Sequence, residues 1–110
     1  MKSGEIWLVE LIDIKGNEQN GLRPALVLAD TITNMVVILP LTSNLKALKF
    51  PYTLAINSSK KNGLSVNSVI LVFQIRAIDK SRLIRKLGFL DKSVLGEIKD
   101  IIVALLINNK

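Results

Sequence analysis

The chain has 110 residues, a length typical of a single folded domain, and we expect residues 1–110 to form one. It has no cysteine and no histidine, which excludes disulfides, thiolate metal sites and the commonest general acid–base residue near neutral pH. Its net charge of +6 fits either an ordinary solvated surface or an anionic partner, such as nucleic acid or a membrane surface.

The first half of the chain contains three apolar segments that predict β-strands. Residues 4–12 are rich in Ile, Trp and Val, which strands prefer. Residues 13–22 are dense in Gly and Asn and predict a loop. The second strand is expected over residues 25–29, directly after Pro24, because a proline belongs at the start or edge of a strand. Residues 35–41 form a continuous apolar run, which is typical of a strand buried on both faces.

The second half begins with strands and ends in a helix. We expect a short strand over residues 53–56, a long one over 68–78 and a third over 85–89, with a turn at 58–63. The apolar period then changes to three and four residues, which predicts a helix; its core positions are Leu90, Val94, Ile98, Ile101 and Leu105. Asp91 is the expected N-cap, and Gly96 indicates close packing against a neighbour.

Short strands followed by one terminal helix predict an α+β domain with a curled antiparallel sheet. Because short strands must avoid open edges, we expect the sheet to close partly into a small barrel. The acidic residues Glu5, Glu10 and Asp13 interrupt the apolar N-terminus, which argues against a secretory signal. The longest apolar run, residues 101–107, is too short to span a membrane, so the expected compartment is the cytoplasm.

Four polar features lie at or near predicted strand ends. They are the loop over residues 17–23, the cluster at 42–44, and the pairs Gln74–Arg76 and Lys80–Arg82. Each feature alone fits a structural role, as surface charge, a turn cap or the exposed side of a strand. Arginine, however, presents a planar fork of donors that matches two phosphate oxygens, so Arg23 is also a candidate anion-binding residue.

Together and in this order, these features resemble the MazF/PemK family of bacterial ribonuclease toxins. The resemblance covers nearly the whole chain, and its most specific parts are Glu-Gln-x-Gly-x-Arg-Pro and Gln-Ile-Arg-x-Ile-Asp-Lys-x-Arg. The matching segments are residues 4–7, 16–27, 40–43, 68–71 and 74–83.

The resemblance implies an SH3-like, partly closed barrel with a C-terminal helix, assembled as a homodimer. Members of this family cleave single-stranded RNA, often messenger RNA at short sequences, without a metal or other cofactor. A cognate antitoxin blocks them by laying its C-terminal segment over the RNA groove. The resemblance therefore implies two macromolecular partners, single-stranded RNA and an antitoxin protein, and no membrane.

The family's catalytic arginine falls on Arg23 and its catalytic threonine on Thr42. Attack of the RNA 2′-hydroxyl on the adjacent phosphorus builds negative charge on phosphoryl oxygens, which both side chains could stabilise. Two routes remain for the proton of the 2′-hydroxyl: Glu18 accepts it, or the transfer is unassisted or mediated by water. The expected RNA-binding residues are Asn17, Gln19, Asn20, Ser43, Gln74, Arg76, Lys80 and Arg82.

Two other functions remain compatible with the sequence. The first is a non-catalytic toxin on the same fold that binds a protein, like the gyrase inhibitor CcdB. The second is an inactive relative that only binds nucleic acid or an antitoxin. Arg23 with Thr42 favours the ribonuclease. The last four residues favour it too, because CcdB-like toxins end in Trp-Gly-Ile and this chain ends in Ile-Asn-Asn-Lys.

Overall fold

The computed structural model describes residues 2–11 and 21–108. In these residues seven strands, three 3-10 turns and one α-helix follow one another: β1 (Glu5–Leu11), β2 (Gly21–Asp30), β3 (Met35–Thr42), η1 (Leu45–Lys49), β4 (Thr53–Ile56), β5 (Ser68–Leu71), η2 (Val72–Gln74), β6 (Arg76–Asp79), η3 (Lys80–Arg82), β7 (Leu83–Phe89) and α1 (Lys92–Leu106).

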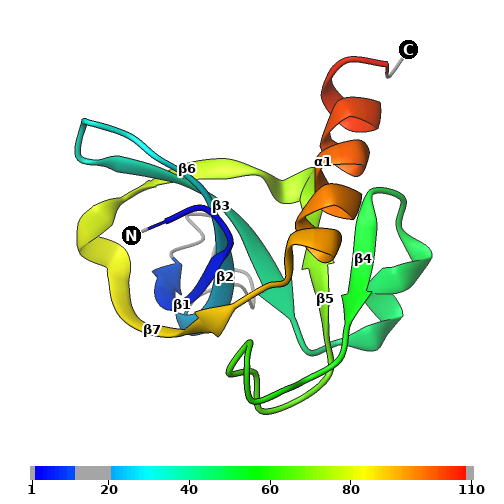
Figure 1. The fold of residues 1–110 in the computed structure, drawn as a ribbon, viewed down its shortest axis with the longest axis horizontal. Coiled ribbons are helices and arrows are strands. Elements are labelled where there is room, and N and C mark those ends of the chain that lie inside the picture. The colour runs from blue at the N-terminus through cyan, green and yellow to red at the C-terminus, as the bar shows by residue number, and fades with distance from the viewer. Residues whose placement is uncertain (1, 12–20, 109–110) are drawn as a thin grey trace.

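All strand pairings are antiparallel, and the strands join in the order β4-β5-β3-β2-β1-β7, with β6 added to β3. The sheet curls, and α1 lies beside β4 and β5 (Figure 1). This arrangement confirms the predicted α+β class. Across the described residues no pairing joins the two ends of the path, β4 and β7, so closure into a barrel stays a prediction.

The central strands separate two apolar cores because successive side chains point to opposite faces of a sheet. β3 contributes to both cores, as its continuous apolar run predicts. The first core packs against α1 and contains Ile6, Leu26, Leu39, Leu41, Leu64, Ile70, Val72, Leu90 and Ile98. The second lies inside the curl and contains Val9, Leu11, Ala25, Val27, Val36, Ile38 and Ile78.

The single strand predicted over residues 68–78 is wrong, because η2 divides it into β5 and β6. Both parts pair with β3, at Leu41↔Ile70 and at Ile38↔Arg76. From the first pair to the second, β3 covers three residues, whereas the segment that pairs with it covers six. The three extra residues match the length of η2, which therefore lets one chain segment pair with β3 twice.

The helix is confirmed, but two details of its prediction differ. Asp91 is the N-cap by position, yet its side chain makes no capping hydrogen bond. The Asp91 carboxylate instead pairs with the Lys61 ammonium at 2.7 Å. A Cβ added at Gly96 would meet nothing within 4 Å among the described residues, so the predicted close packing there is wrong. In residues 2–11 and 21–108 no helix is long and apolar enough to cross a membrane.

Candidate active site

Arg23 and Thr42 lie on neighbouring strands of the β2–β3 hairpin. The pairing of these strands includes Ala25↔Pro40. Arg23 lies two residues before Ala25, and Thr42 lies two residues after Pro40. Because two steps along a strand return to the same face, both side chains belong to one side of the hairpin. The register of a single hairpin therefore positions the guanidinium relative to the hydroxyl.

Pro24 explains why the hydrogen-bonded pairing of β2 with β3 does not continue beyond Ala25↔Pro40. It lies inside β2 opposite Leu8 of β1, while the pairing of β2 with β3 begins only at Ala25. A proline has no N–H to donate, so it is tolerated where a strand is paired on one side. β2 starts earlier than predicted, at Gly21, so Arg23 belongs to the strand rather than to a loop.

A cavity of about 280 Å³ lies at this end of the hairpin. Arg23, Thr42 and Ser43 line one side of it, and the connection between β4 and β5 supplies the opposite wall. Arg23 and Thr42 are half-buried, whereas Ser43 is exposed. The structure thus brings together three of the residues predicted for the site.

The opposite wall was missed by the sequence-based prediction. It is formed by Leu64, Ser65, Val66 and Ser68, of which only Ser68 falls in a segment that matches the family. Their position depends on Asn62, which is only 4% exposed. The Asn62 Oδ1 accepts from the backbone N–H groups of residues 59 and 64, both at 3.0 Å, and its Nδ2 donates to the residue 57 carbonyl at 2.9 Å. One buried amide therefore shapes the loop over residues 57–67.

Local hydrogen bonds hold the Thr42 side chain in place. Its Oγ1 accepts from the Asn44 N–H at 3.1 Å. The Asn44 Oδ1 in turn accepts from the Lys46 N–H at 3.1 Å and caps η1. A hydroxyl whose oxygen already accepts one bond keeps its own proton for donation. Thr42 can therefore donate a hydrogen bond to an anionic oxygen in the cavity.

A second hollow, of about 290 Å³, shares Thr42 with the first and contains Gln74. Phe50 and Phe73 line it at a centroid distance of 6.1 Å in an edge-to-face arrangement. Their exposed fractions are 48% and 38%, so both rings are partly accessible to solvent. The ammonium of Lys49 lies 5.4 Å from the Phe50 ring centroid. This hollow combines aromatic faces with positive charge directly beside Thr42.

Arg76 and Arg82 lie together in a different hollow, of about 400 Å³, near the end of β1. Leu11 and Asp79 also line this hollow, and Asp79 lies between the two arginines in the sequence. The backbone N–H of Ser81, at 2.8 Å, is the chief reason that the pKa of the Asp79 carboxyl lies below its ordinary value. Neither arginine lines the cavity beside Arg23 or the second hollow beside Thr42.

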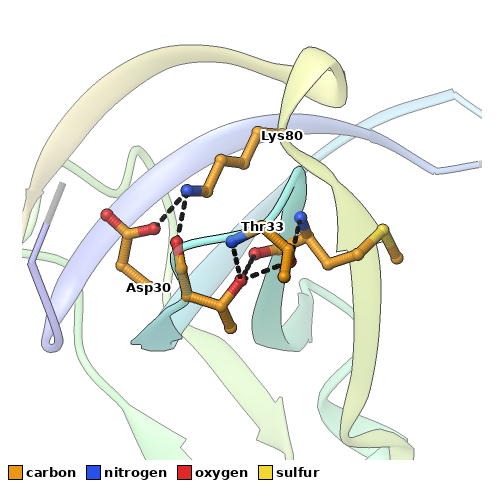
Figure 2. A network of polar contacts seen from close by, with 5 residues as sticks. Asp30, Thr33 and Lys80 are labelled. Carbon is orange, nitrogen blue, oxygen red and sulfur yellow. Dashed lines mark hydrogen bonds and ion pairs between the residues drawn. The ribbon is translucent and has the colours of Figure 1, made fainter.

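Lys80 braces the turn between β2 and β3 (Figure 2). Its ammonium lies 2.7 Å from the Asp30 carboxylate and donates to the Thr31 carbonyl at 2.7 Å. This contact is the chief reason that the pKa of Asp30 is lowered. The Thr31 and Thr33 hydroxyls, 2.6 Å apart, and a bond from Thr31 Oγ1 to the residue 35 carbonyl complete the network. Lys80 thus has a structural role at the end of the hairpin opposite Thr42.

Four predicted site residues, Asn17, Glu18, Gln19 and Asn20, lie outside the described residues. Within the described part, no group of three or more Asp or Glu side chains comes together in a way that could hold a metal ion. The fold and the first cavity therefore define a small α+β protein in which an arginine and a threonine line one cavity.

Comparisons with known proteins agree with this description. A family model described as PemK-like, MazF-like toxin of type II toxin-antitoxin system matches residues 2–106. A protein named endoribonuclease MazF from Staphylococcus epidermidis is 33% identical over 114 residues, which cover 99% of this chain and 94% of the relative.

Solved structures show the same fold. A crystal structure of MazF from Deinococcus radiodurans has a TM-score of 0.78 at 27% identity and covers 96% of each chain. A MazE-MazF structure from the same organism has a TM-score of 0.73 at 28% identity, with 96% of this chain and 95% of that chain covered. The chain belongs to the PemK-like, MazF-like toxins of type II toxin–antitoxin systems. The family predicted from the sequence is confirmed.

Proposed function

We propose that this protein is an endoribonuclease that cleaves single-stranded RNA, with messenger RNA as its cellular substrate, as the toxin of a type II toxin–antitoxin system. The observation that carries the proposal is the placement of Arg23 and Thr42 on one side of the β2–β3 hairpin, at a shared cavity. Relatives named endoribonuclease MazF and EndoA, each 33% identical, support it. The substrate would be met in the cytoplasm.

The proposed reaction is an internal transfer within the RNA. The 2′-hydroxyl oxygen attacks the adjacent phosphorus, the bond to the 5′-oxygen breaks, and a cyclic phosphate and a 5′-hydroxyl end result. Negative charge on the phosphoryl oxygens is stabilised by the Arg23 guanidinium, which remains charged, and by the Thr42 hydroxyl. The 2′-hydroxyl proton passes to Glu18 or to water, and the departing 5′-oxygen takes up a proton from water. These steps need no metal ion.

The second hollow supports selection of the RNA sequence. Because it shares Thr42 with the cavity, a nucleotide next to the cleaved bond would enter it. Phe73 and Phe50 offer ring faces or edges to a base, and base–aromatic stacking contributes about 1–3 kcal/mol per base. Gln74 can read a base edge by hydrogen bonds, while the lysines of η1 attract phosphates. The remaining predicted RNA contacts, Arg76 and Arg82 among them, would bind more distant phosphates.

Exposed apolar side chains support assembly as a homodimer. At the end of α1, Val103, Leu106 and Ile107 are 38%, 57% and 74% exposed. Leu45 and Leu48 of η1 are also exposed. Such apolar surfaces mark sites of protein association. We place the copy-to-copy contact at the end of α1, and we propose that a cognate antitoxin covers the RNA site; the MazE-MazF structure from Deinococcus radiodurans supports that partner.

Cleavage of a long single-stranded RNA in EDTA tests the function. The wild type should cut, and Arg23→Ala and Thr42→Ala should each slow cleavage by roughly 10²–10³-fold, the cost of losing one oxyanion donor. Arg85→Ala, which removes an exposed arginine of β7 outside the cavity, is the matched control and should cut at the wild-type rate. Intact RNA across a pool of varied sequences, with or without EDTA, would contradict the proposal and favour a CcdB-like or inactive toxin.

A further inference from the structure

The aromatic ring of Phe89 lies at the end of β7 between two hollows. One, of about 430 Å³, is bordered by the end of β4 and the loop over residues 57–67. The other, of about 420 Å³, is bordered by the start of β1 and of α1. Phe89 lines both and is 47% exposed. A half-exposed ring with open space on two sides is suited to stacking on a flat ligand.

Lysines surround this ring. Lys2, Lys61, Lys86 and Lys92 line the two hollows, against the two carboxylates of Glu5 and Asp91. Each carboxylate already pairs with a lysine, Asp91 with Lys61 at 2.7 Å and Glu5 with Lys86 at 3.2 Å. The ammonium of Lys61 also lies 5.9 Å from the centroid of the Phe89 ring. The surface around the ring is therefore positive overall and fits a polyanion that carries aromatic groups.

Backbone contacts hold this surface in shape. The Phe89 N–H donates to the Lys61 carbonyl at 3.0 Å, and the next N–H along the chain donates to the Gly4 carbonyl at 2.9 Å. A Cβ at Gly63, where φ is +72°, would lie 2.0 Å from the Leu87 carbonyl oxygen. The loop and β7 thus approach as closely as their backbones allow. A preformed backbone of this kind lowers the ordering cost of binding.

The same loop connects the Phe89 surface to the cavity that holds Arg23 and Thr42. Lys61 lines the hollow beside Phe89, and Leu64 lines the cavity. Their Cα atoms are three residues apart and so separated by at most about 11 Å. A flexible strand that leaves the cavity along this loop would reach the ring after a short path.

We propose that Phe89 and its surrounding lysines bind a nucleotide of the same single-stranded RNA, outside the cleaved bond. The proposal rests on the function proposed above. A base stacks on Phe89, and the phosphates beside it lie against Lys61 and Lys92. Basic residues that follow the backbone, combined with an aromatic side chain that stacks on bases, are the usual features of single-strand binding surfaces. The contact strengthens binding of RNA long enough to reach it and leaves the cleavage chemistry unchanged.

Binding of two uncleavable probes tests this surface. The probes are 2′-O-methyl RNAs of about five and about twenty nucleotides, sizes that bracket single-strand binding sites, and fluorescence anisotropy measures their affinity. Phe89→Ala and Phe89→Leu should weaken the long probe by about 5- to 150-fold, the loss of one stacked base. The short probe should bind as to the wild type, and Phe89→Tyr should restore the long one. Thermal unfolding checks that each variant folds.

Salt dependence tests the lysines separately. Lys61→Gln combined with Lys92→Gln should reduce the slope of log affinity against log salt for the long probe by about 0.7 per lost phosphate contact. Lys99→Gln, on the exposed surface of α1, is the matched control and should leave the slope unchanged.

The remaining outcomes contradict either the proposed function or the inference about Phe89. A wild type that binds neither probe contradicts the proposed function. If folded Phe89→Ala and Phe89→Leu bind the long probe as tightly as the wild type does, the inference is overturned and the proposed function is unaffected. The same conclusion holds if these variants bind an acidic protein less tightly while their affinity for the long probe is unchanged. Equal weakening of both probes also overturns it, because the ring would then act through the cavity.

Discussion

Adding the same methyl group at Gly88 or at Gly96 should change stability in opposite directions. In Gly88→Ala the new Cβ would lie 2.2 Å from the Lys61 carbonyl oxygen and 2.5 Å from the Asn62 carbonyl carbon, far inside the van der Waals separation of about 3.5–4.0 Å. These are backbone atoms, held by the hydrogen bonds of Asn62 and Phe89, so they cannot turn away as a side chain would. Overpacking of this kind costs about 1–3 kcal/mol, and we expect the upper end of that range.

Gly96→Ala is the matched variant. Its Cβ would meet nothing within 4 Å of the described residues, and alanine favours a helix interior over glycine by about 1 kcal/mol. The two variants should therefore differ by roughly 2–4 kcal/mol in the free energy of unfolding, or roughly 8–16 °C in Tm for a chain of this size. Urea and thermal unfolding at one fixed protein concentration measure the difference, because the proposed dimerisation would make Tm depend on concentration.

Equal stability of the two variants would refute this reasoning. It would mean that the 57–67 loop moves freely away from β7 in solution. A loop that moved so easily could not serve as a fixed wall of the cavity, so the same result would weaken the structural argument for the candidate active site. Cleavage by Gly88→Ala provides a second readout, and we expect it to fall below that of Gly96→Ala.

Three further predictions concern the hairpin, the helix and the assembly. Lys80 lowers the pKa of Asp30 below its ordinary 3.8, so this carboxylate stabilises the fold above that pH and loses its contribution as the pH falls. Asp30→Asn should therefore reduce the loss of unfolding free energy between about pH 5 and pH 2, as measured by urea titrations. Ile98→Ala, which truncates the buried side chain of α1, should cost about 2–5 kcal/mol by the same assay. Leu106→Glu should shift the proposed dimer towards monomer in sedimentation equilibrium, and an unchanged dimer would exclude the end of α1 from the contact.

The fold could be predicted where the local pattern of apolar residues decides the structure. The run over residues 35–41 predicted a strand buried on both faces, and β3 does contribute to two cores. The break at η2 could not be predicted, because residues 68–78 are apolar through most of their length and include several β-branched side chains. What interrupts them is the way this segment meets β3 twice, and such a tertiary constraint leaves no mark on local propensity.

The candidate site was predictable only in its motif residues. Arg23 and Thr42 follow from the sequence resemblance, and the structure places them on one hairpin. The wall over residues 64–68 was not predictable, because small and aliphatic side chains there signal neither chemistry nor a bend. Lys80 lies in a family motif that predicted an RNA contact, and that contact stays a prediction. Its ion pair with Asp30, which the structure shows, was not indicated by the local sequence. Motifs identify residue types, and only the fold shows which partners they meet.

The order of the strands along the chain has a consequence for synthesis on the ribosome. Arg23 and Thr42 emerge early, but the facing wall over residues 64–68 and the strands β5 and β6 that flank β3 are translated later. The nascent chain therefore carries Arg23 and Thr42 before it has the cavity that they line. Any reaction that needs the closed cavity must therefore wait until the chain has been made past residue 68.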